Sequence, residues 1–348
     1  MKIYDYSFLK NGNIPSNLVN LLTGIYSLKT SDEFRKSRFE TVYTELEKIA
    51  KVQSIKGSNA IEGVVTTDER INAIVNQNSA PLNHNEEEIA GYRDALNIVH
   101  TTYKDLIFNK QTLLGLHGLL FQMSNPSAAG RFKDEDNVIM EVRNDGTRSV
   151  GFKPVSAKDT DIAMEQLILA YISARDDSEI NQLLLIPCVI LDFLCIHPFK
   201  DGNGRMSRLL TLWLLYKAGF DAGKYISFEE QINKNKGLYY EALKKSSINW
   251  ENNSNDYFYF VGNFLMTLLS CYQELDKRFA TVNSKKINKE SRIEATVLHS
   301  LVPISKKEIG EILPDISVST IEMVLTKMVN EGKIIKIGTA SQTRYYRK

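Results

Sequence analysis

The sequence predicts a mainly α-helical protein with one β-hairpin and a small C-terminal domain. Apolar residues recur every three or four positions along most of the 348 residues, which is the period of an amphipathic helix. Residues 138–152 instead alternate around turn residues, which favours a hairpin. A polar and basic stretch at 281–289 then precedes a last group of helices and strands, which indicates a separate domain.

Composition and charge are those of an ordinary globular protein. The 43 basic residues nearly balance the 42 acidic ones, so we expect no global attraction to nucleic acid or to a membrane. The N-terminus has no apolar signal core, and the apolar run at 183–196 is too short to span a membrane. Cys188, Cys195 and Cys271 are odd in number and indicate free thiols in a reducing cytosol. We therefore expect a cytoplasmic protein without a disulfide framework or a zinc site.

The helical pattern extends over both sides of the hairpin. Each expected helix carries its apolar residues on one face, and turn residues separate it from the next. We expect helices over 17–28, 34–52, 67–76, 86–103, 110–123, 159–175, 235–244 and 257–279, with loops at 81–85 and 219–231. Two near-continuous apolar runs, 183–196 and 209–216, predict a central pair of buried helices.

The segment 54–64, SIKGSNAIEGV, allows two interpretations. Ser58 and Glu62 are four residues apart and Gly63 follows, so the segment fits a short helix with a serine near its start and a glycine stop. It also fits a functional motif, and the choice between the two depends on the loop described next.

The strongest functional signal is HPFKDGNGRMSR, residues 197–208, between the two apolar runs. Gly202 and Gly204 flank Asn203 where a helix should begin, so the backbone can turn tightly and direct free N–H groups toward an anion. Arg205 and Arg208 are three residues apart in the first turn, which predicts that both guanidiniums lie near the same phosphate group.

Two further residues of this loop supply chemistry. Asp201 places a carboxylate where phosphates are expected, which favours a bridging Mg²⁺. His197, four residues earlier, is the group of the loop that can accept a proton near neutral pH. The loop therefore predicts a phosphoryl or nucleotidyl transfer site. His117, alone on the helix over 110–123, is expected to be structural and is left out of the site.

The loop resembles the signature of the Fic family, HxF-x-[D/E]-GNGR-xx-R, and matches it at every defined position. The resemblance implies a mostly helical enzyme that transfers AMP from ATP to a hydroxyl of a target protein. It implies the following roles: His197 deprotonates a Ser, Thr or Tyr, Phe199 anchors the loop, Asp201 binds Mg²⁺, Gly202, Asn203 and Gly204 form the anion hole, and Arg205 and Arg208 hold the β- and γ-phosphates. The related Doc toxins, which are kinases, have lysine at the Gly204 position, so the glycine favours transfer of AMP.

The segment 58–63, SNAIEG, is similar to the Fic inhibitory motif [S/T]xxxE[G/N]. The resemblance implies that Ser58 and Glu62 belong to an inhibitory helix and that Glu62 pairs with Arg208, so that ATP binds in a non-productive pose. In some relatives the same glutamate positions a water that removes AMP from the modified target. A deAMPylase that uses Glu62 is therefore an alternative function.

Two other segments gain a role from the resemblance. A hairpin is expected from Val138–Val142, a turn at 144–146 and Ser149–Phe152. It fits either an ordinary surface hairpin or a Fic flap, which binds an extended target segment by strand addition. AGRF at 129–132 resembles family sequence just before the flap. Tyr239 and Tyr240 are either contacts for the adenine base or core residues.

The C-terminal part predicts helices over 292–301, 305–313 and 317–331 and a hairpin of 334–337 with 343–346. Three helices and a two-stranded wing resemble a winged helix. Residues 285–348 carry twelve basic and seven acidic residues, but the expected recognition helix holds Glu322 and Glu331 against Lys327, which is a poor face for DNA. DNA binding, dimerisation and partner docking all remain open.

These observations predict four parts of the chain: an N-terminal helical region with the inhibitory motif (1–105), a Fic catalytic core (106–280), a linker (281–290) and a winged-helix-like domain (291–348). The expected function is an autoinhibited protein adenylyltransferase that uses ATP and Mg²⁺. The expected partners are an unidentified target protein, which can be the protein itself, a second copy in a homodimer, and DNA through the winged helix, but no membrane. A DNA-binding regulator whose Fic core senses nucleotide is the other alternative.

Overall fold

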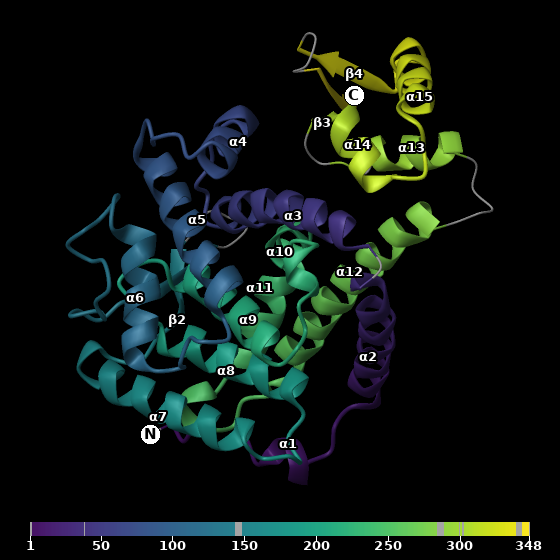
Figure 1. Ribbon diagram of the computed structural model, residues 1–348. Coiled ribbons are helices and arrows are strands. Elements are labelled where there is room, and N and C mark those ends of the chain that lie inside the picture. The colour runs from purple at the N-terminus through teal and green to yellow at the C-terminus, as the bar shows by residue number, and fades with distance from the viewer. Residues whose placement is uncertain are drawn as a thin grey trace.

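The computed structural model describes residues 2–37, 39–142, 148–283, 289–298, 300, 303–338 and 343–347. Its described residues form helices and two small antiparallel sheets, which confirms the predicted mainly α class (Figure 1). The helices of the larger part are α1 (Phe8–Asn11), α2 (Ser16–Lys36), α3 (Glu40–Ile61), α4 (Asp68–Asn76), α5 (His84–Thr102), α6 (Lys110–Phe121), α7 (Ala157–Arg175), α8 (Gln182–Ile196), α9 (Asn203–Lys217), α10 (Phe228–Lys234), α11 (Lys236–Ser247) and α12 (Phe258–Asn283), with 3₁₀ turns η1 (Ala222–Lys224) and η2 (Trp250–Asn252).

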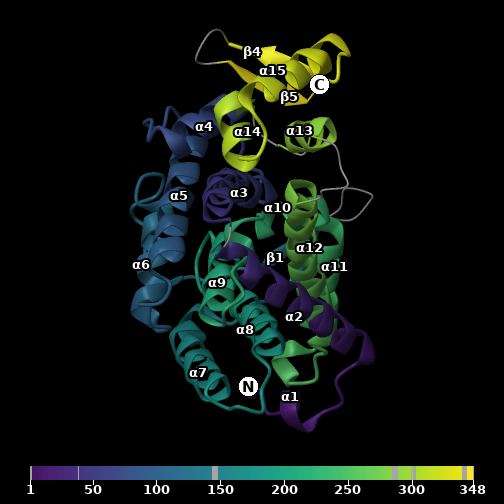
Figure 2. The ribbon, with the colours of Figure 1, turned by 45° about the vertical axis from the view of Figure 1, so that its right-hand side comes forward.

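The central pair of helices forms as the apolar runs predict. Every residue of α8 from Leu183 to Ile196 is buried, and α9 is buried from Arg205 to Tyr216. The surrounding helices α2, α3, α5, α7 and α12 pack around this pair, so the loop between α8 and α9 lies at the edge of a thick apolar core (Figure 2). Asp192 is buried in the middle of α8, and the Tyr6 and Tyr257 hydroxyls and the Trp250 indole N–H donate hydrogen bonds to its carboxylate.

Helix α3 corrects the expected boundaries near the N-terminus. The residues predicted as one helix over 34–52 belong to two helices, because α2 ends at Lys36 and α3 begins at Glu40. The short helix considered for 54–64 is the last part of α3, which ends at Ile61. Gly57 does not interrupt α3, because it lies where the helix meets α10: an added Cβ would lie 3.1 Å from the Glu230 nitrogen. Close packing therefore stabilises a glycine that local propensity disfavours. Ser58 lies in the last turn of α3 rather than near a helix start, and Gly63 follows the helix with a positive φ of 81°.

A second correction concerns the loop expected at 219–231, because helix α10 begins inside it at Phe228 and continues to Lys234. Ser227 caps it by accepting a hydrogen bond from the Glu230 N–H, and two glutamates follow in the first turn, which suits the helix dipole. The pattern of a capping serine followed by acidic residues was therefore readable in the sequence.

The expected hairpin is present as β1 (Ile139–Val142) and β2 (Arg148–Phe152), which pair antiparallel. The register pairs Met140 with Val150 and shifts between Ile139 and Met140. The turn predicted at 144–146 lies outside the described residues. Phe152 packs against the main core, which fixes one end of the hairpin to the larger part.

The C-terminal part has its own apolar core, separate from the main one. Its elements are α13 (Lys289–Leu298), β3 (Ile304–Ser305), α14 (Lys306–Ile312), α15 (Val318–Asn330), β4 (Ile334–Ile337) and β5 (Arg344–Arg347). The strands form one antiparallel sheet in the order β3-β5-β4, so the sequence missed β3, which is only two residues long. Helix α14 lies directly against α3 (Figure 2).

Surface charges on the C-terminal part are largely compensated within it. On α15, Glu322 pairs with Lys306 and Lys327 pairs with Glu290. DNA binding by this part stays one of three open expectations, beside dimerisation and partner docking. In the part of the chain that the structure describes, no helix is both long and apolar enough to cross a membrane.

Candidate active site

The loop between α8 and α9 is held in one shape by its own backbone and by Asn203. His197 ends α8 with a positive φ of 52°, and Gly202 precedes α9 with a φ of 78°. The Asn203 side chain donates to the Phe199 carbonyl (2.8 Å) and accepts from the Phe199 N–H (2.9 Å). A Cβ at Gly202 would collide with the ring of Phe121, so this position requires glycine for space as well as for conformation. The Asn203 side chain thus braces the loop, while the first N–H groups of α9 remain available to an anion.

His117 supports the same loop from α6. Its ring stacks on Phe199, with ring centroids 3.8 Å apart and an interplanar angle of 3°. Its Nδ1 accepts the Gly130 N–H (3.0 Å), which leaves Nε2 to donate to the Asp201 carbonyl oxygen (3.1 Å). Burial lowers the pKa of His117 to about 4, so the ring is neutral. The residue has a structural role, as predicted, but the sequence contained no signal that it would hold the loop at 197–208.

His197 lies in a buried environment that keeps its ring neutral. Burial is the main cause that lowers the pKa of His197 to about 4, and the nearby charge of Lys133 adds to it. The Leu194 carbonyl, Asp201 and Glu62 favour the protonated ring, but less strongly. A neutral imidazole at pH 7 is the form that accepts a proton.

Lys133 is a residue of the site that sequence reasoning missed. Its side chain is buried, its Nζ donates to the Ile196 carbonyl (3.2 Å) and its backbone N–H donates to the Pro198 carbonyl (2.9 Å). Lys133 therefore fixes the backbone on both sides of His197. Its position directly after the AGRF segment was the signal that could have identified it.

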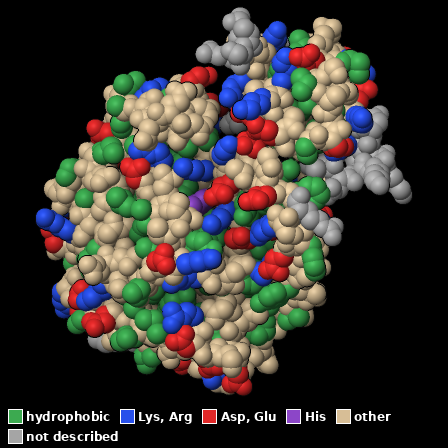
Figure 3. All heavy atoms as spheres, in the orientation of Figure 1, with side chains coloured by type: hydrophobic (Ala, Val, Ile, Leu, Met, Phe, Trp, Pro, Cys, Tyr) green, Lys and Arg blue, Asp and Glu red, His purple; other side chains and the backbone are tan. Residues whose placement is uncertain are grey.

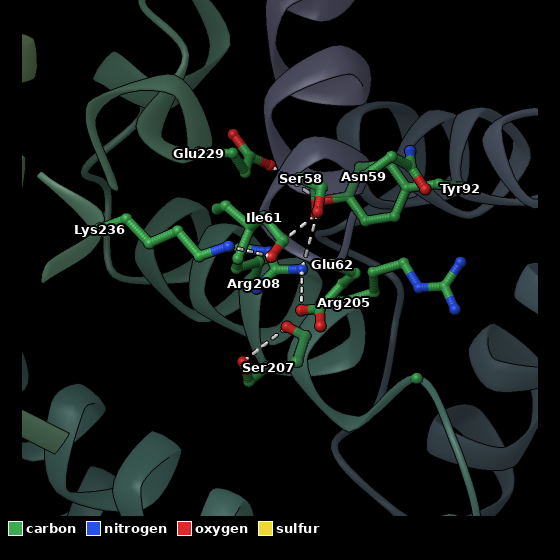
Figure 4. Close-up of polar contacts among 12 residues, drawn as sticks. Ser58, Asn59, Ile61, Glu62, Tyr92, Arg205, Ser207, Arg208, Glu229 and Lys236 are labelled. Atoms are coloured by element: carbon green, nitrogen blue, oxygen red, sulfur yellow. Dashed lines mark hydrogen bonds and ion pairs between the residues drawn. The ribbon is translucent and has the colours of Figure 1, made fainter. Parts of the chain in front are cut away.

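Arg208 is held by the end of α3. Its guanidinium is 2% exposed, its Nε donates to Ser58 Oγ (2.8 Å), and its Nη2 donates to the Ser58 carbonyl (3.0 Å) and to Glu62 Oε1 (2.8 Å) (Figure 4). Lys236 of α11 donates to the Ile61 carbonyl (2.5 Å) and so caps the same end of α3. The predicted contact between Glu62 and Arg208 is present, together with a serine contact that the motif also supplies.

Gly204 and Glu62 occupy neighbouring space. A Cβ at Gly204 would collide with Glu62 Oε1 and would lie 3.3 Å from Arg208 Nη1. The carboxylate of Glu62 therefore fills the place beside the second glycine, at the N-terminus of α9, where an anion is expected to bind.

Arg205 does not share an anion site with Arg208 in this structure. Its guanidinium is 2% exposed, forms an ion pair with Glu88 of α5 and lies 4.8 Å from the centre of the Phe121 ring. Figure 4 shows the two arginine side chains pointing in different directions. The spacing of three residues predicted one shared face, but each guanidinium has a carboxylate partner from a different helix.

Asp201 is exposed, as is its neighbour Lys200. Its side chain is 70% exposed, and Oδ1 accepts the Gly202 N–H (2.5 Å). Among the described residues, no three His, Cys, Asp or Glu side chains gather into a group that can hold a metal ion. One exposed carboxylate fits a Mg²⁺ whose other ligands are phosphate oxygens and waters, which is the usual mode for this ion.

The two tyrosines of α11 differ. Tyr239 is buried, lies edge-on to Phe260 with ring centroids 5.7 Å apart, and has its pKa raised to about 12 by burial. Tyr240 is 41% exposed. These environments favour a core role for Tyr239 and leave Tyr240 as the accessible aromatic face. Contact of either residue with adenine stays a prediction.

The Ser58→Ala variant is expected to be destabilised by about 1–3 kcal/mol, because the buried Arg208 Nε–H would lose its acceptor. Urea unfolding followed by tryptophan fluorescence measures this, since Trp213 and Trp250 both lie in the main core. Thr44→Ala is the control on the same helix. The exposed Thr44 hydroxyl donates a hydrogen bond to the Glu40 carbonyl and is not an acceptor for a buried charged group. Equal stability of the two variants would contradict the expectation.

Comparison with known proteins agrees with this site. The Fic/DOC family matches residues 107–215, which include the loop at 197–208. The protein adenylyltransferase Fic of Nematostella vectensis is 27% identical over 207 residues, which cover 58% of this chain and 44% of that protein. The chain thus matches less than half the length of this relative.

Solved structures show the same fold. A Fic family protein from Desulfovibrio desulfuricans G20 is similar with a TM-score of 0.62 and 19% identity, over 97% of each chain. A Fic domain containing signaling protein from Bacteroides thetaiotaomicron VPI-5482 has a TM-score of 0.56 and 20% identity, over 74% of this chain and 94% of that one. Residues 107–215 thus match the Fic/DOC family, and the fold is similar to that of solved Fic proteins.

Proposed function

We propose that the protein is a protein adenylyltransferase that moves AMP from ATP to a hydroxyl of a target protein and is restrained by its own helix α3. One observation carries the proposal: the glycine-bordered N-terminus of α9 lies beside a partly buried, neutral His197, and the Glu62 carboxylate forms an ion pair with Arg208 of α9. An unpaired helix N-terminus with a buried arginine is suited to phosphates. The similarity to the adenylyltransferase of Nematostella vectensis supports the same chemistry.

In the proposed reaction, His197 takes the proton of a target hydroxyl, and the oxygen attacks the α-phosphorus of ATP in line with the departing pyrophosphate. The P–O bond between the α-phosphorus and the pyrophosphate breaks as the new P–O bond forms. The N–H groups of Gly204 and its neighbours and the Arg208 guanidinium stabilise the phosphate charge. Asp201 would hold the Mg²⁺ that accompanies the nucleotide and neutralises this charge.

Restraint by α3 follows from the contacts of Arg208. While Glu62 and Ser58 hold the guanidinium, Arg208 cannot donate those hydrogen bonds to a γ-phosphate, and the Glu62 carboxylate repels the phosphate chain. Gly57 and the buried contact between Ser54 Oγ and Ser227 Oγ (2.9 Å) pack α3 against α10. Release therefore requires a change in the last turn of α3, where the Glu62 side chain is 32% exposed.

The experiment that tests the proposal asks which phosphorus becomes attached to protein. Purified Glu62→Gly protein is incubated with Mg²⁺ and ATP labelled at either the α- or the γ-phosphate, and intact mass is measured in parallel. We expect label from the α-phosphate and a mass increase of one AMP, and no label from the γ-phosphate. Label from the γ-phosphate would instead indicate a kinase and would overturn the proposal.

The hydrolytic alternative predicts a different result with the same protein. A deAMPylase that uses Glu62 should remove AMP from previously labelled protein in the wild type and lose that activity in Glu62→Gly. The exposed part of the Glu62 side chain leaves room for a water beside it. Loss of label that does not depend on Glu62 would exclude this alternative.

A further inference from the structure

A buried chain of hydrogen bonds leads from Arg208 into the core (Figure 4). Arg208 Nε donates to Ser58 Oγ (2.8 Å), and Ser58 is in turn hydrogen-bonded to the Tyr92 hydroxyl. The Tyr92 hydroxyl donates to Glu229 Oε1 (2.9 Å). The chain thus joins α9, α3, α5 and α10, and its members Ser58, Tyr92 and Glu229 are fully buried. We call these three residues the support chain of Arg208. On the surface seen in Figure 3, charged side chains of both signs cover the larger part, whereas the support chain lies beneath it.

The two ends of the support chain set the direction of every hydrogen bond in it. A guanidinium has only donors, and the Glu229 carboxylate has only acceptors. Burial raises the pKa of Tyr92 well above its usual value, so its proton stays on the phenol and is donated to the carboxylate. The Tyr92 oxygen therefore accepts from the Ser58 hydroxyl, which leaves Ser58 Oγ as the acceptor for Arg208. Hydrogen bonds aligned in this way in the interior strengthen one another.

Glu229 has its compensating charge at a distance. In the part of the chain that the structure describes, its carboxylate forms no ion pair and accepts from two hydroxyls, those of Tyr92 and Ser227 (3.3 Å). A buried carboxylate is costly unless hydrogen bonds and positive charge compensate it. The first turn of α10, in which Glu229 lies, supplies part of this charge. The guanidinium at the other end of the support chain supplies more.

The contacts of Arg208 separate support from restraint. The support chain holds Nε, whereas Glu62 Oε1 contacts Nη2 (2.8 Å). Nη1 lies toward the N-terminus of α9, because a Cβ at Gly204 would be 3.3 Å from it. Ser58 is fully buried, but the Glu62 side chain is 32% exposed. Departure of Glu62 would therefore free the part of the guanidinium that faces the anion site and leave Nε held.

We propose that Glu229 is a positioning residue for the proposed reaction, acting on Arg208 through Tyr92 and Ser58. When Glu62 leaves, the support chain keeps the guanidinium directed toward the terminal phosphates of a bound nucleotide. A pre-oriented arginine loses less conformational freedom on binding, so affinity for these phosphates is higher. Ser58 then serves the active state as well as the restrained one. The inference rests on the proposed function, because it concerns the arginine of that site.

The test compares binding of ATP with binding of AMP, by titration calorimetry with Mg²⁺. The parent is the Glu62→Gly and His197→Ala protein, which lacks both the restraint and the base and so binds nucleotide without transferring AMP. Tyr92→Phe in this parent removes the hydroxyl and keeps the ring. We expect ATP to bind about three- to tenfold more weakly and AMP to bind equally well, because AMP lacks the phosphates that Arg208 contacts. A merely structural role would weaken both nucleotides or neither.

Tyr6→Phe is the matched control. Tyr6 is also buried and also donates to a buried carboxylate, that of Asp192 (2.8 Å), but it is not part of the support chain. This variant should keep the ATP affinity of the parent.

Two further variants test the ends of the support chain. Ser58→Ala should weaken ATP binding at least as much as Tyr92→Phe, because it removes the direct acceptor of Arg208 Nε. Glu229→Gln should also weaken it, since an amide can donate as well as accept and no longer sets the direction of the chain. Circular dichroism checks that each variant keeps its helices.

Three results would overturn the proposal. The first is equal ATP affinity in Tyr92→Phe and Tyr6→Phe, or no ATP binding by the parent. The second is an equal loss of ATP and AMP affinity in Tyr92→Phe. The third is faster α-phosphate labelling by Tyr92→Phe than by wild type when Glu62 is intact, because the chain would then serve restraint alone. If the ATP-specific loss is measured but Glu62→Gly transfers no AMP, the proposed function fails and the positioning of Arg208 stands.

Discussion

Glu62→Gly is expected to transfer AMP about 10- to 100-fold faster than the wild type. The variant removes a charged hydrogen bond that holds the buried Arg208, and such bonds contribute about 1.5–3 kcal/mol. It also removes a carboxylate from the space beside Gly204, where the phosphates are proposed to bind. The freed guanidinium then stabilises the leaving pyrophosphate. Initial rates of α-phosphate labelling, with the protein itself as acceptor, measure the effect.

Two companion variants make this expectation specific. Glu62→Gln keeps the size of the side chain and loses its charge, so its rate should lie between those of the wild type and Glu62→Gly. Glu69→Gly, on the exposed first turn of α4, should leave the rate unchanged. A rate for Glu62→Gly no higher than that of Glu69→Gly would show that the contact between Glu62 and Arg208 does not restrain the enzyme.

His197→Ala in the Glu62→Gly background is expected to lower AMP transfer by about 100- to 10,000-fold, which is the usual contribution of a general base. Binding of ATP should be nearly unchanged, because the N-terminus of α9 and Arg208 remain in place. Separate measurements of nucleotide binding and of labelling distinguish the two steps. Labelling that persists in this variant would remove His197 from the mechanism.

The pH dependence of the Glu62→Gly enzyme provides a second test of His197. Because burial lowers its pKa to about 4, the neutral form that accepts a proton persists as the pH falls through 6.5, and activity should be lost only toward pH 4. Lys133→Met removes the positive charge that contributes to this shift, so the midpoint of the acid limb should move upward. If the activity of the Glu62→Gly enzyme instead fell with a midpoint near pH 6.5, His197 would titrate like an exposed histidine, which would contradict its partly buried environment.

The residues of the candidate site could be predicted from the sequence because they are contiguous. One stretch of twelve residues contains His197, Asp201, Gly202 and Arg208, and their roles depend on the backbone of a single loop and the first turn of α9. The segment 58–63 resembles a family motif, and its residues Ser58 and Glu62 both contact Arg208. The boundaries of α3 were not readable, because Gly57 is accommodated by contact with α10 rather than by its own propensity.

By itself, the sequence determined the helical class, the buried pair of helices and the order of chemical groups in the loop, because hydrophobic period and residue type are local properties. The tertiary structure decided which distant residues meet these groups. Glu88 of α5 draws Arg205 away from Arg208, Lys133 holds the backbone around His197, and His117 stacks under the loop. Such partnerships depend on how helices pack, and packing joins residues 63 to 117 positions apart, which no spacing in the sequence predicts.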